Sequence, residues 1–90
     1  MRYERKPSFD RSFAHLSEVQ RQDVILALDQ LTQALETGRR PQGLGLRKLR
    51  QAFWEIRLGL SLRVLFRLQG DLVELVLVGS HDEIRRVLAR

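Results

Sequence analysis

Hydrophobic residues in the first part of the chain recur with the period of a helix. Phe9, Phe13 and Leu16 follow one another at the spacing of a single helix face. They come directly after Pro7, a residue that is common at the first position of helices. The pattern therefore predicts a short helix that begins near Pro7 and buries its aromatic side.

A second, longer helix is predicted from Ser17 to about Thr37. Ser17 and Gln20 have the spacing of a capping box, in which the serine hydroxyl accepts from the Gln20 backbone N–H and the glutamine side chain returns the bond. Gly38 is placed to end this helix in the left-handed conformation. We expect the two helices to form a hairpin. The apolar stripe of the second helix consists of Val24, Leu28, Leu31 and Leu35, with Ala27 and Ala34 beside it.

The pattern changes after Gly45 from a helical period to alternation, which is typical of strands. Residues Phe53–Leu58 and Leu62–Leu68 both alternate, and residues 59–61 can form a three-residue turn between them. All cross-strand apolar pairs then fall on one face, which favours this register. The predicted pairs are Leu58 with Leu62, Ile56 with Val64 and Trp54 with Phe66.

Three further elements complete the pattern. Residues 72–78 follow a tight turn at Gly70 and are apolar nearly throughout, which indicates a central strand covered on both sides. Residues 3–6 form a weaker candidate strand, and residues 46–50 a strand or an extended arm. Ser80 and Glu83 repeat the capping-box spacing and predict a short C-terminal helix.

These elements predict an α+β fold, in which an N-terminal helical hairpin packs on a small, mainly antiparallel β-sheet and a short C-terminal helix follows. A chain of 90 residues is expected to form one domain, residues 1–90. No apolar run approaches the roughly 20 residues of a membrane span, and the N-terminus lacks the apolar core of a secretion signal. We therefore expect a cytoplasmic protein without a membrane partner.

Charge adds a second pattern to the first. The net charge is +5, with a surplus of about four positive charges in residues 46–90 and about one in residues 1–45. Between residues 39 and 67 the only acid is Glu55. A polyanion such as nucleic acid, or an acidic protein, is the partner that such a surface favours. The basic residues of this segment are Arg39, Arg40, Arg47, Lys48, Arg50, Arg57, Arg63 and Arg67.

The predicted register places Arg57 directly opposite Arg63, and like charges at such a position are destabilising. Either the two long side chains splay into solvent, or an anion binds between them. A two-residue turn before the next strand would place Glu74 opposite Arg67, which would partly neutralise that arginine.

The residue inventory restricts the chemistry. Without cysteine and with only two histidines, no metal site and no cofactor are expected. Arg57 and Arg63 could hold a phosphate and stabilise the charge of its transition state. His81 can exchange a proton near neutral pH, although a polar residue at a helix start is the simpler interpretation of this position. We interpret His15 as a structural or surface residue.

Five sequence segments together resemble the RelE/ParE superfamily of bacterial type II toxins. The resemblance covers nearly the whole chain and is strongest between residues 43 and 83. The five segments come after the predicted helical hairpin, which is itself part of the resemblance. The segments are Gly-Leu-Gly-Leu-Arg-Lys-Leu, Phe-Trp-Glu-Ile-Arg-Leu, Leu-Arg-Val-Leu-Phe, the Gly-Asp turn, and the run Leu-Val-Leu-Val-Gly-Ser-His-Asp-Glu that begins at Leu75.

The resemblance implies a toxin that cleaves mRNA in the ribosomal A site and is bound by a cognate antitoxin, often with an acidic tail, as a possible hetero-oligomer. It implies catalytic roles for Arg57, Arg63 and His81, the last of which resembles the histidine of the YafQ-like branch. The residues left for binding the RNA backbone are Arg47, Lys48, Arg50 and Arg67.

The sequence departs from RelE at Glu55, where RelE has a basic residue, and it has no tyrosine after Tyr3. Two alternatives therefore stay open. One is a ParE-like inhibitor of DNA gyrase without catalytic activity, and the other is an inactive toxin homologue.

Overall fold

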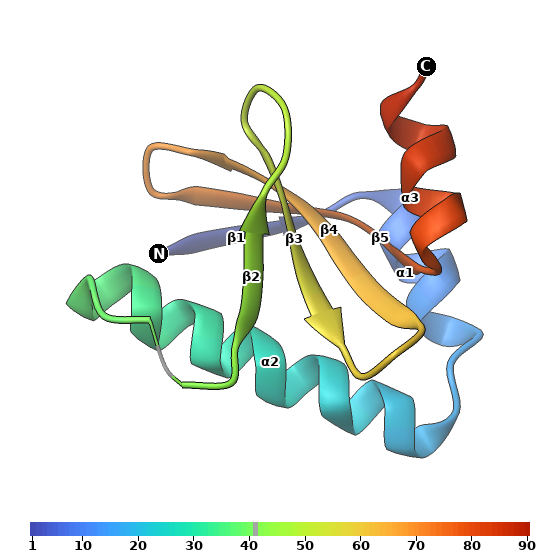
Figure 1. The fold of residues 1–90 in the computed structure, drawn as a ribbon, viewed down its shortest axis with the longest axis horizontal. Helices are drawn as coiled ribbons and strands as arrows, with labels where there is room; N and C mark the ends of the chain where they lie inside the picture. Colours follow the sequence, from blue (N-terminus) through green and yellow to red (C-terminus); the bar gives the residue numbers. More distant parts are fainter. Residues whose placement is uncertain (41) are drawn as a thin grey trace.

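The chain forms a five-stranded sheet with three helices in a computed structural model, which describes residues 1–40 and 42–90 (Figure 1). The order of the strands across the sheet is β1-β5-β4-β3-β2. The helices are α1 (Pro7–Ala14), α2 (Glu18–Thr37) and α3 (His81–Leu88). The strands are β1 (Arg2–Arg5), β2 (Gly45–Lys48), β3 (Phe53–Leu58), β4 (Leu62–Gln69) and β5 (Leu72–Gly79).

The alternating pattern predicted the register of the central β-hairpin correctly. β3 and β4 pair antiparallel with Ile56 opposite Val64, and Arg57 lies opposite Arg63 as predicted. Arg67 lies opposite Glu74 on β5, again as predicted. The segment near residue 48, for which a strand or an extended arm was expected, is a strand at the sheet edge.

Two features of the predicted fold are matched only in part. The sheet is mixed, because β1 pairs with β5 in the parallel direction, with Tyr3 beside Val73. The two N-terminal helices also make their main contacts with the sheet, α1 with β5 and α2 with β3, so the expected helical hairpin is only part of the arrangement. Both differences arise from contacts between distant segments, which local periodicity does not encode.

One face of the sheet, here called the core face, carries Ile56, Val64 and Phe66 and packs against α1 and α2. All three side chains are buried, and Leu31 of α2 is fully buried against the same cluster. The helix is well defined at both ends. The Ser17–Gln20 capping box is present, and Gly38 ends α2 with a φ of 73°, as predicted.

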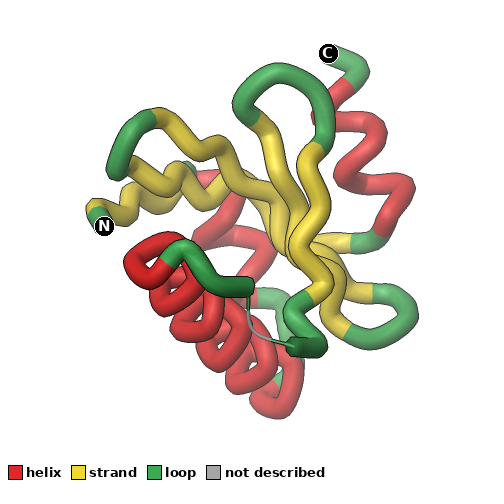
Figure 2. Tube along the Cα trace, turned by 60° about the vertical axis from the view of Figure 1, so that its left-hand side comes forward, coloured by secondary structure: helices red, strands yellow, loops and turns green. Residues whose placement is uncertain are grey.

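The opposite face, here called the α3 face, carries the residues that alternate with the core residues. Leu65 is fully buried although it lies between Val64 and Phe66 and so points the other way. Ile84 of α3 is buried too, and α3 contacts β4 and β5. Figure 2 shows α2 and α3 on opposite sides of the strands. A second, smaller buried layer therefore exists beneath α3.

The outer edge of β5 is completed by helix α1 rather than by another strand. β1 accompanies β5 only as far as Leu75. Beyond that point the Ser8 hydroxyl donates to the Val76 carbonyl, and the Val78 backbone N–H donates to the Ser12 hydroxyl at 3.0 Å. Buried backbone groups need partners, and two serines supply them here.

Candidate nucleic-acid interface

Four residues at one end of the α3 face form a row across the sheet, here called the arginine row. It consists of Gly45, Arg57, Arg63 and Gly79, one residue from each of four neighbouring strands. Because glycines stand at both ends, the two arginines are the only side chains in the row. A Cβ on Gly45 would lie 3.0 Å from the Arg57 carbonyl oxygen, so the close approach of β2 to β3 requires this glycine.

The two arginines of the row have different surroundings. Arg57 is exposed, and no ion pair in the described part of the chain involves it. The Arg63 side chain is only 13% exposed, and its Nη1 donates to both carboxylate oxygens of Glu55 at 3.0 and 3.3 Å. Glu55 is 3% exposed at its side chain. The like-charge contact expected from the sequence is therefore relieved on one side by an internal anion.

The next row of the α3 face brings a further basic residue to this end of the sheet. Arg47 of β2 lies opposite Glu55 and is exposed. Lys48 is its neighbour in the strand and points to the other face, where its Nζ lies 5.9 Å from the centre of the Trp54 ring. Arg50 is exposed in the loop after β2. The four residues predicted to bind RNA thus do not form one surface.

Arg67, the fourth of these residues, belongs to a separate ion cluster farther along the α3 face. Its Nη1 lies 3.5 Å from Glu74, and Lys6 reaches the same carboxylate at 3.2 Å. The Arg67 guanidinium also lies 5.6 Å from the centre of the Phe53 ring. Burial of Glu74 explains why two cations gather there, because a buried carboxylate is stable only when it is paired.

His81 is the first residue of α3 and is exposed. It follows Gly79, the last member of the arginine row, by two positions, so the fold brings it to the same end of the sheet. The helix start is held by the predicted capping box, in which the Ser80 backbone N–H donates to Glu83 at 3.0 Å. This backbone hydrogen bond, with the Ser80 hydroxyl, lowers the pKa of Glu83.

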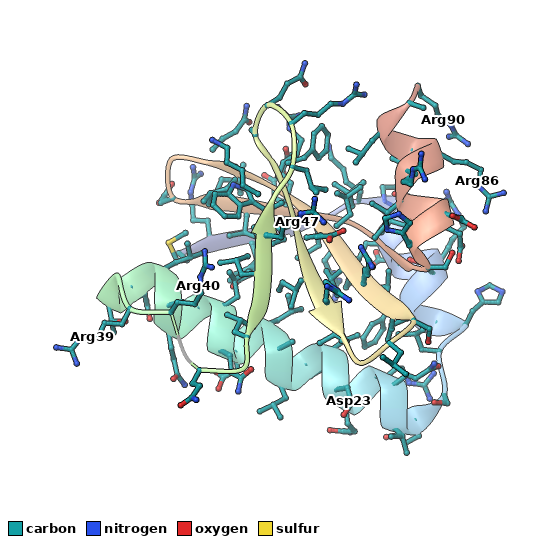
Figure 3. The ribbon with its side chains drawn as sticks, in the orientation of Figure 1. Asp23, Arg39, Arg40, Arg47, Arg86 and Arg90 are labelled. Carbon is teal, nitrogen blue, oxygen red and sulfur yellow. The ribbon has the colours of Figure 1, made fainter. Side chains whose placement is uncertain are left out.

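A second cluster of basic residues lies outside residues 39–67, the segment in which the sequence analysis placed the basic surface. Arg86 of α3 and Arg90, two residues after the end of that helix, lie well apart from Arg47 and from Arg39, which follows α2 (Figure 3). The surplus of basic residues near the C-terminus was a signal that could have revealed them. Arg11 of α1 joins them in lining one hollow, and this meeting of two helices has no local signal in the sequence.

The arrangement offers anion binding beside one proton-transfer group. In residues 1–40 and 42–90, no three histidine, aspartate or glutamate side chains gather where they could hold a metal ion. Over the same residues, no helix has both the length and the hydropathy required to cross a membrane. The side chains at this end of the sheet that could bind an anion or exchange a proton are those of Arg57, Arg63, Arg47 and His81.

Comparison with known proteins gives a clear answer for the fold. A chain of the RelB–RelE antitoxin–toxin complex from Methanococcus jannaschii superimposes with a TM-score of 0.70 over 93% of this chain and 96% of that one, at 15% identity. This chain has the RelE/ParE toxin fold. A chain of the Escherichia coli DinJ–YafQ complex gives a TM-score of 0.66 at 14% identity, over 93% and 98% of the two chains.

The YoeB/ParE toxin from Agrobacterium tumefaciens has the RelE/ParE fold too, with a TM-score of 0.56 at 19% identity over 90% of this chain and 99% of that one. No family model and no curated protein matches the chain by sequence. Because all three identities lie below one fifth, the likeness establishes the RelE/ParE fold and leaves the activity to the residues of the site.

Proposed function

We propose that this protein is the toxin of a type II toxin–antitoxin pair and cleaves mRNA on the ribosome. The observation that carries the proposal is the arginine row, in which exposed Arg57 stands directly opposite Arg63 at the end of the sheet where α3 begins. An unpaired guanidinium on a sheet surface has the geometry to bind a phosphate through two hydrogen bonds. The RelE/ParE fold and the antitoxin complexes of its structural neighbours support the same proposal.

The proposed reaction uses the RNA as its own nucleophile. The 2′-oxygen attacks the adjacent phosphorus, the bond from phosphorus to the 5′-oxygen breaks, and a 2′,3′-cyclic phosphate and a 5′-hydroxyl result. One proton leaves the 2′-hydroxyl and one reaches the departing 5′-oxygen. Arg57 stabilises the charge that develops on the phosphate, and His81 serves as general acid or general base.

Arg63 has a more restricted role in this reaction than Arg57. One of its nitrogens is committed to Glu55, so only its remaining N–H groups can donate to a phosphate. The carboxylate fixes the direction of the guanidinium while the charge of the pair is close to zero. Arg47 extends the positive surface from the row towards the sheet edge, and Arg50 follows in the next loop. Lys48 points to the other face of the edge strand and contributes less to RNA binding in this proposal.

Arg67 contributes less to RNA binding in this proposal, since it is paired with Glu74. The expected partners are mRNA in the ribosomal A site and a cognate antitoxin, with which the protein forms a hetero-oligomer. The reaction as written uses neither a metal ion nor another cofactor.

A translation reaction with a defined mRNA tests the proposal. Primer extension should detect cleavage within the A-site codon when the purified protein is added. Arg57→Ala should lower the rate about 100-fold, the usual cost of removing one group that stabilises transition-state charge. His81→Ala should also lower the rate. Arg39→Ala is the matched control and should act like wild type, because Arg39 is also exposed and forms no ion pair with the residues that the structure describes. Intact ribosome-bound mRNA with wild-type protein would refute the enzyme proposal.

The second candidate is a ParE-like inhibitor of DNA gyrase. The ion pair between Arg63 and Glu55 favours it, because the pair removes one free cation from the proposed catalytic set. A supercoiling assay separates the two functions. Inhibition of gyrase that persists in His81→Ala, together with intact mRNA, would support this candidate.

A further inference from the structure

A hollow of ≈ 480 Å³ lies between the start of α1 and the last turn of α3, and we call it the Phe53 hollow. Phe53 of β3 lies four residues before Arg57, about 13 Å away along the strand. No residue of the arginine row lines this hollow. Its volume lies in the range of sites that bind small molecules. The lining residues are Lys6, Pro7, Ser8, Arg11, Phe53, Arg67, Val76 and Val87.

Three cations line the Phe53 hollow, and none of its described lining residues is an acid. Arg11 is exposed and is in no ion pair with the residues that the structure describes. Pro7 and Ser8 bring the start of α1 to the same wall, and the start of a helix attracts anions. This side of the hollow therefore suits a phosphate group.

The other side of the hollow offers a flat stacking surface. Phe53 is half-buried, and the Arg67 guanidinium lies 5.6 Å from the centre of its ring. Aromatic rings and guanidinium planes are the protein groups on which unpaired nucleobases stack. Val76 and Val87 add apolar surface beside them. A stacking surface next to phosphate-binding groups is the combination that a nucleotide requires.

Glu74 supplies a hydrogen-bond acceptor behind these cations. Its side chain is 10% exposed, and its Oε1 is buried without a hydrogen-bond partner among the residues that the structure describes. Arg67 Nη1 lies 3.5 Å from this oxygen, in an ion pair that includes no hydrogen bond to it. Since the Arg67 side chain is 36% exposed, it can turn aside and admit an N–H donor. Buried polar atoms are normally hydrogen-bonded, so such a donor would complete the site.

We propose that the Phe53 hollow binds a nucleotide whose base carries an exocyclic amino group. The base stacks on Phe53 and Arg67 and donates its amino N–H to Glu74, while the phosphate lies against Arg11 and the start of α1. Adenine, guanine and cytosine have such an amino group, whereas uracil has a carbonyl oxygen where cytosine has the amino group. Only the identification of this nucleotide with part of an mRNA substrate rests on the proposed function.

Isothermal titration calorimetry on the full-length protein tests the proposal with a matched pair of ligands. Cytidine and uridine 5′-monophosphate have the same size and phosphate and differ in the group that faces Glu74. Wild-type protein should bind the cytidine nucleotide about tenfold or more tightly, the effect of one hydrogen bond to a charged group. Short oligocytidylate separates the two sources of the nucleotide. Tighter binding of the oligomer than of the monomer points to RNA, and equal binding points to a free nucleotide.

Variants assign the binding to this hollow. Phe53→Leu keeps an apolar side chain without the flat ring and should weaken binding of the cytidine nucleotide about tenfold. Phe13→Leu makes the same change in a half-buried residue of α1 that does not line the hollow, and it should bind like wild type. Glu74→Gln should reduce the discrimination between the two nucleotides. Melting curves show whether each variant is folded, and the comparison of ligands on wild-type protein needs no variant at all.

Three results would overturn the nucleotide site. They are no binding of either nucleotide, equal binding of both to wild-type protein, and unchanged binding in Phe53→Leu. The translation reaction tests the proposed function separately. Nucleotide binding with intact mRNA would refute the cleavage proposal alone, and A-site cleavage without nucleotide binding would refute the nucleotide site alone.

Discussion

Helices cover both faces of the sheet, but the two faces use different chemistry. The core face is closed by α1 and α2 over aliphatic and aromatic side chains, with Ile56 and Val64 fully buried. The α3 face also has a fully buried residue, Leu65, yet it holds two buried acids, Glu55 and Glu74. Each acid is neutralised by at least one cation.

This difference separates what stabilises the protein from what it can do. Burial of apolar surface contributes about 25 cal/mol per Å², whereas a buried ion pair does little more than offset its own desolvation. The core face should therefore supply most of the stability. The α3 face keeps charged groups at fixed positions, and this is the property that an anion-binding surface requires.

The largest expected effect is a cavity beneath the core face. Phe66→Ala removes a side chain that is 1% exposed and should lower the free energy of unfolding by about 4 kcal/mol. Urea denaturation followed by circular dichroism measures this change. Val19→Ala is the control, because Val19 is 71% exposed on α2 and should change stability by less than about 0.5 kcal/mol. Equal effects of the two changes would contradict the assigned core.

Breaking the buried ion pair on the α3 face should cost slightly less. Glu55→Gln leaves the Arg63 guanidinium nearly buried beside a neutral amide and should cost about 3 kcal/mol. The double variant Glu55→Leu with Arg63→Met should recover most of this loss, since an apolar pair of similar size needs no neutralisation. If the single variant is as stable as wild type, the pair is solvated and the contrast between the faces disappears.

The start of α3 should show a smaller effect. Ser80→Ala removes the hydroxyl that accepts from the Glu83 backbone N–H at 3.2 Å and should cost about 1 kcal/mol. Chemical denaturation can resolve a change of this size. Ser80→Asp retains an acceptor at this position and is the matched control, with stability expected to stay near that of wild type.

Acidification should weaken the same helix start. The hydrogen bonds from Ser80 lower the pKa of Glu83 in the folded protein. Ionised Glu83 therefore contributes to stability at a pH above its pKa in the unfolded chain, and this contribution is lost as the pH falls through its pKa in the folded protein. We expect that contribution to fade below about pH 4. Unfolding curves of wild type and Glu83→Gln should converge there, and a constant difference across this range would argue against a charged cap.

The smallest effect on stability is expected at Arg57. Arg57→Ala removes one of two opposing arginines and should change the free energy of unfolding by no more than about 0.5 kcal/mol, towards higher stability. The same variant should lose RNA cleavage. A large loss of stability would mean that Arg57 is structural, and the distinction between it and Arg63 would fail.

The sequence predicted those parts of the fold that local patterns determine. Alternation placed Arg57 opposite Arg63, and the two serine caps fixed the starts of α2 and α3. Alternation also places the neighbouring residues Arg47 and Lys48 on opposite faces of a strand. The sequence could therefore have shown that these two residues do not belong to one RNA-binding surface.

The remainder of the site depends on tertiary contacts. Nothing near Glu55 in the sequence indicates that this carboxylate is buried beside Arg63. The parallel pairing of β1 with β5 joins residues about 70 positions apart, as with Arg2 and Leu72. The meeting of Arg11 with Arg86 likewise exists only once α1 and α3 are in place.

The two serines of α1 also have a consequence for how copies of this protein behave in a concentrated solution. An open strand edge is a template on which another chain can add and start aggregation. Ser8 and Ser12 occupy the acceptor and donor that β5 would otherwise present there. A helix thus gives this part of β5 the protection against strand addition that other proteins obtain from a bulge or an edge lysine.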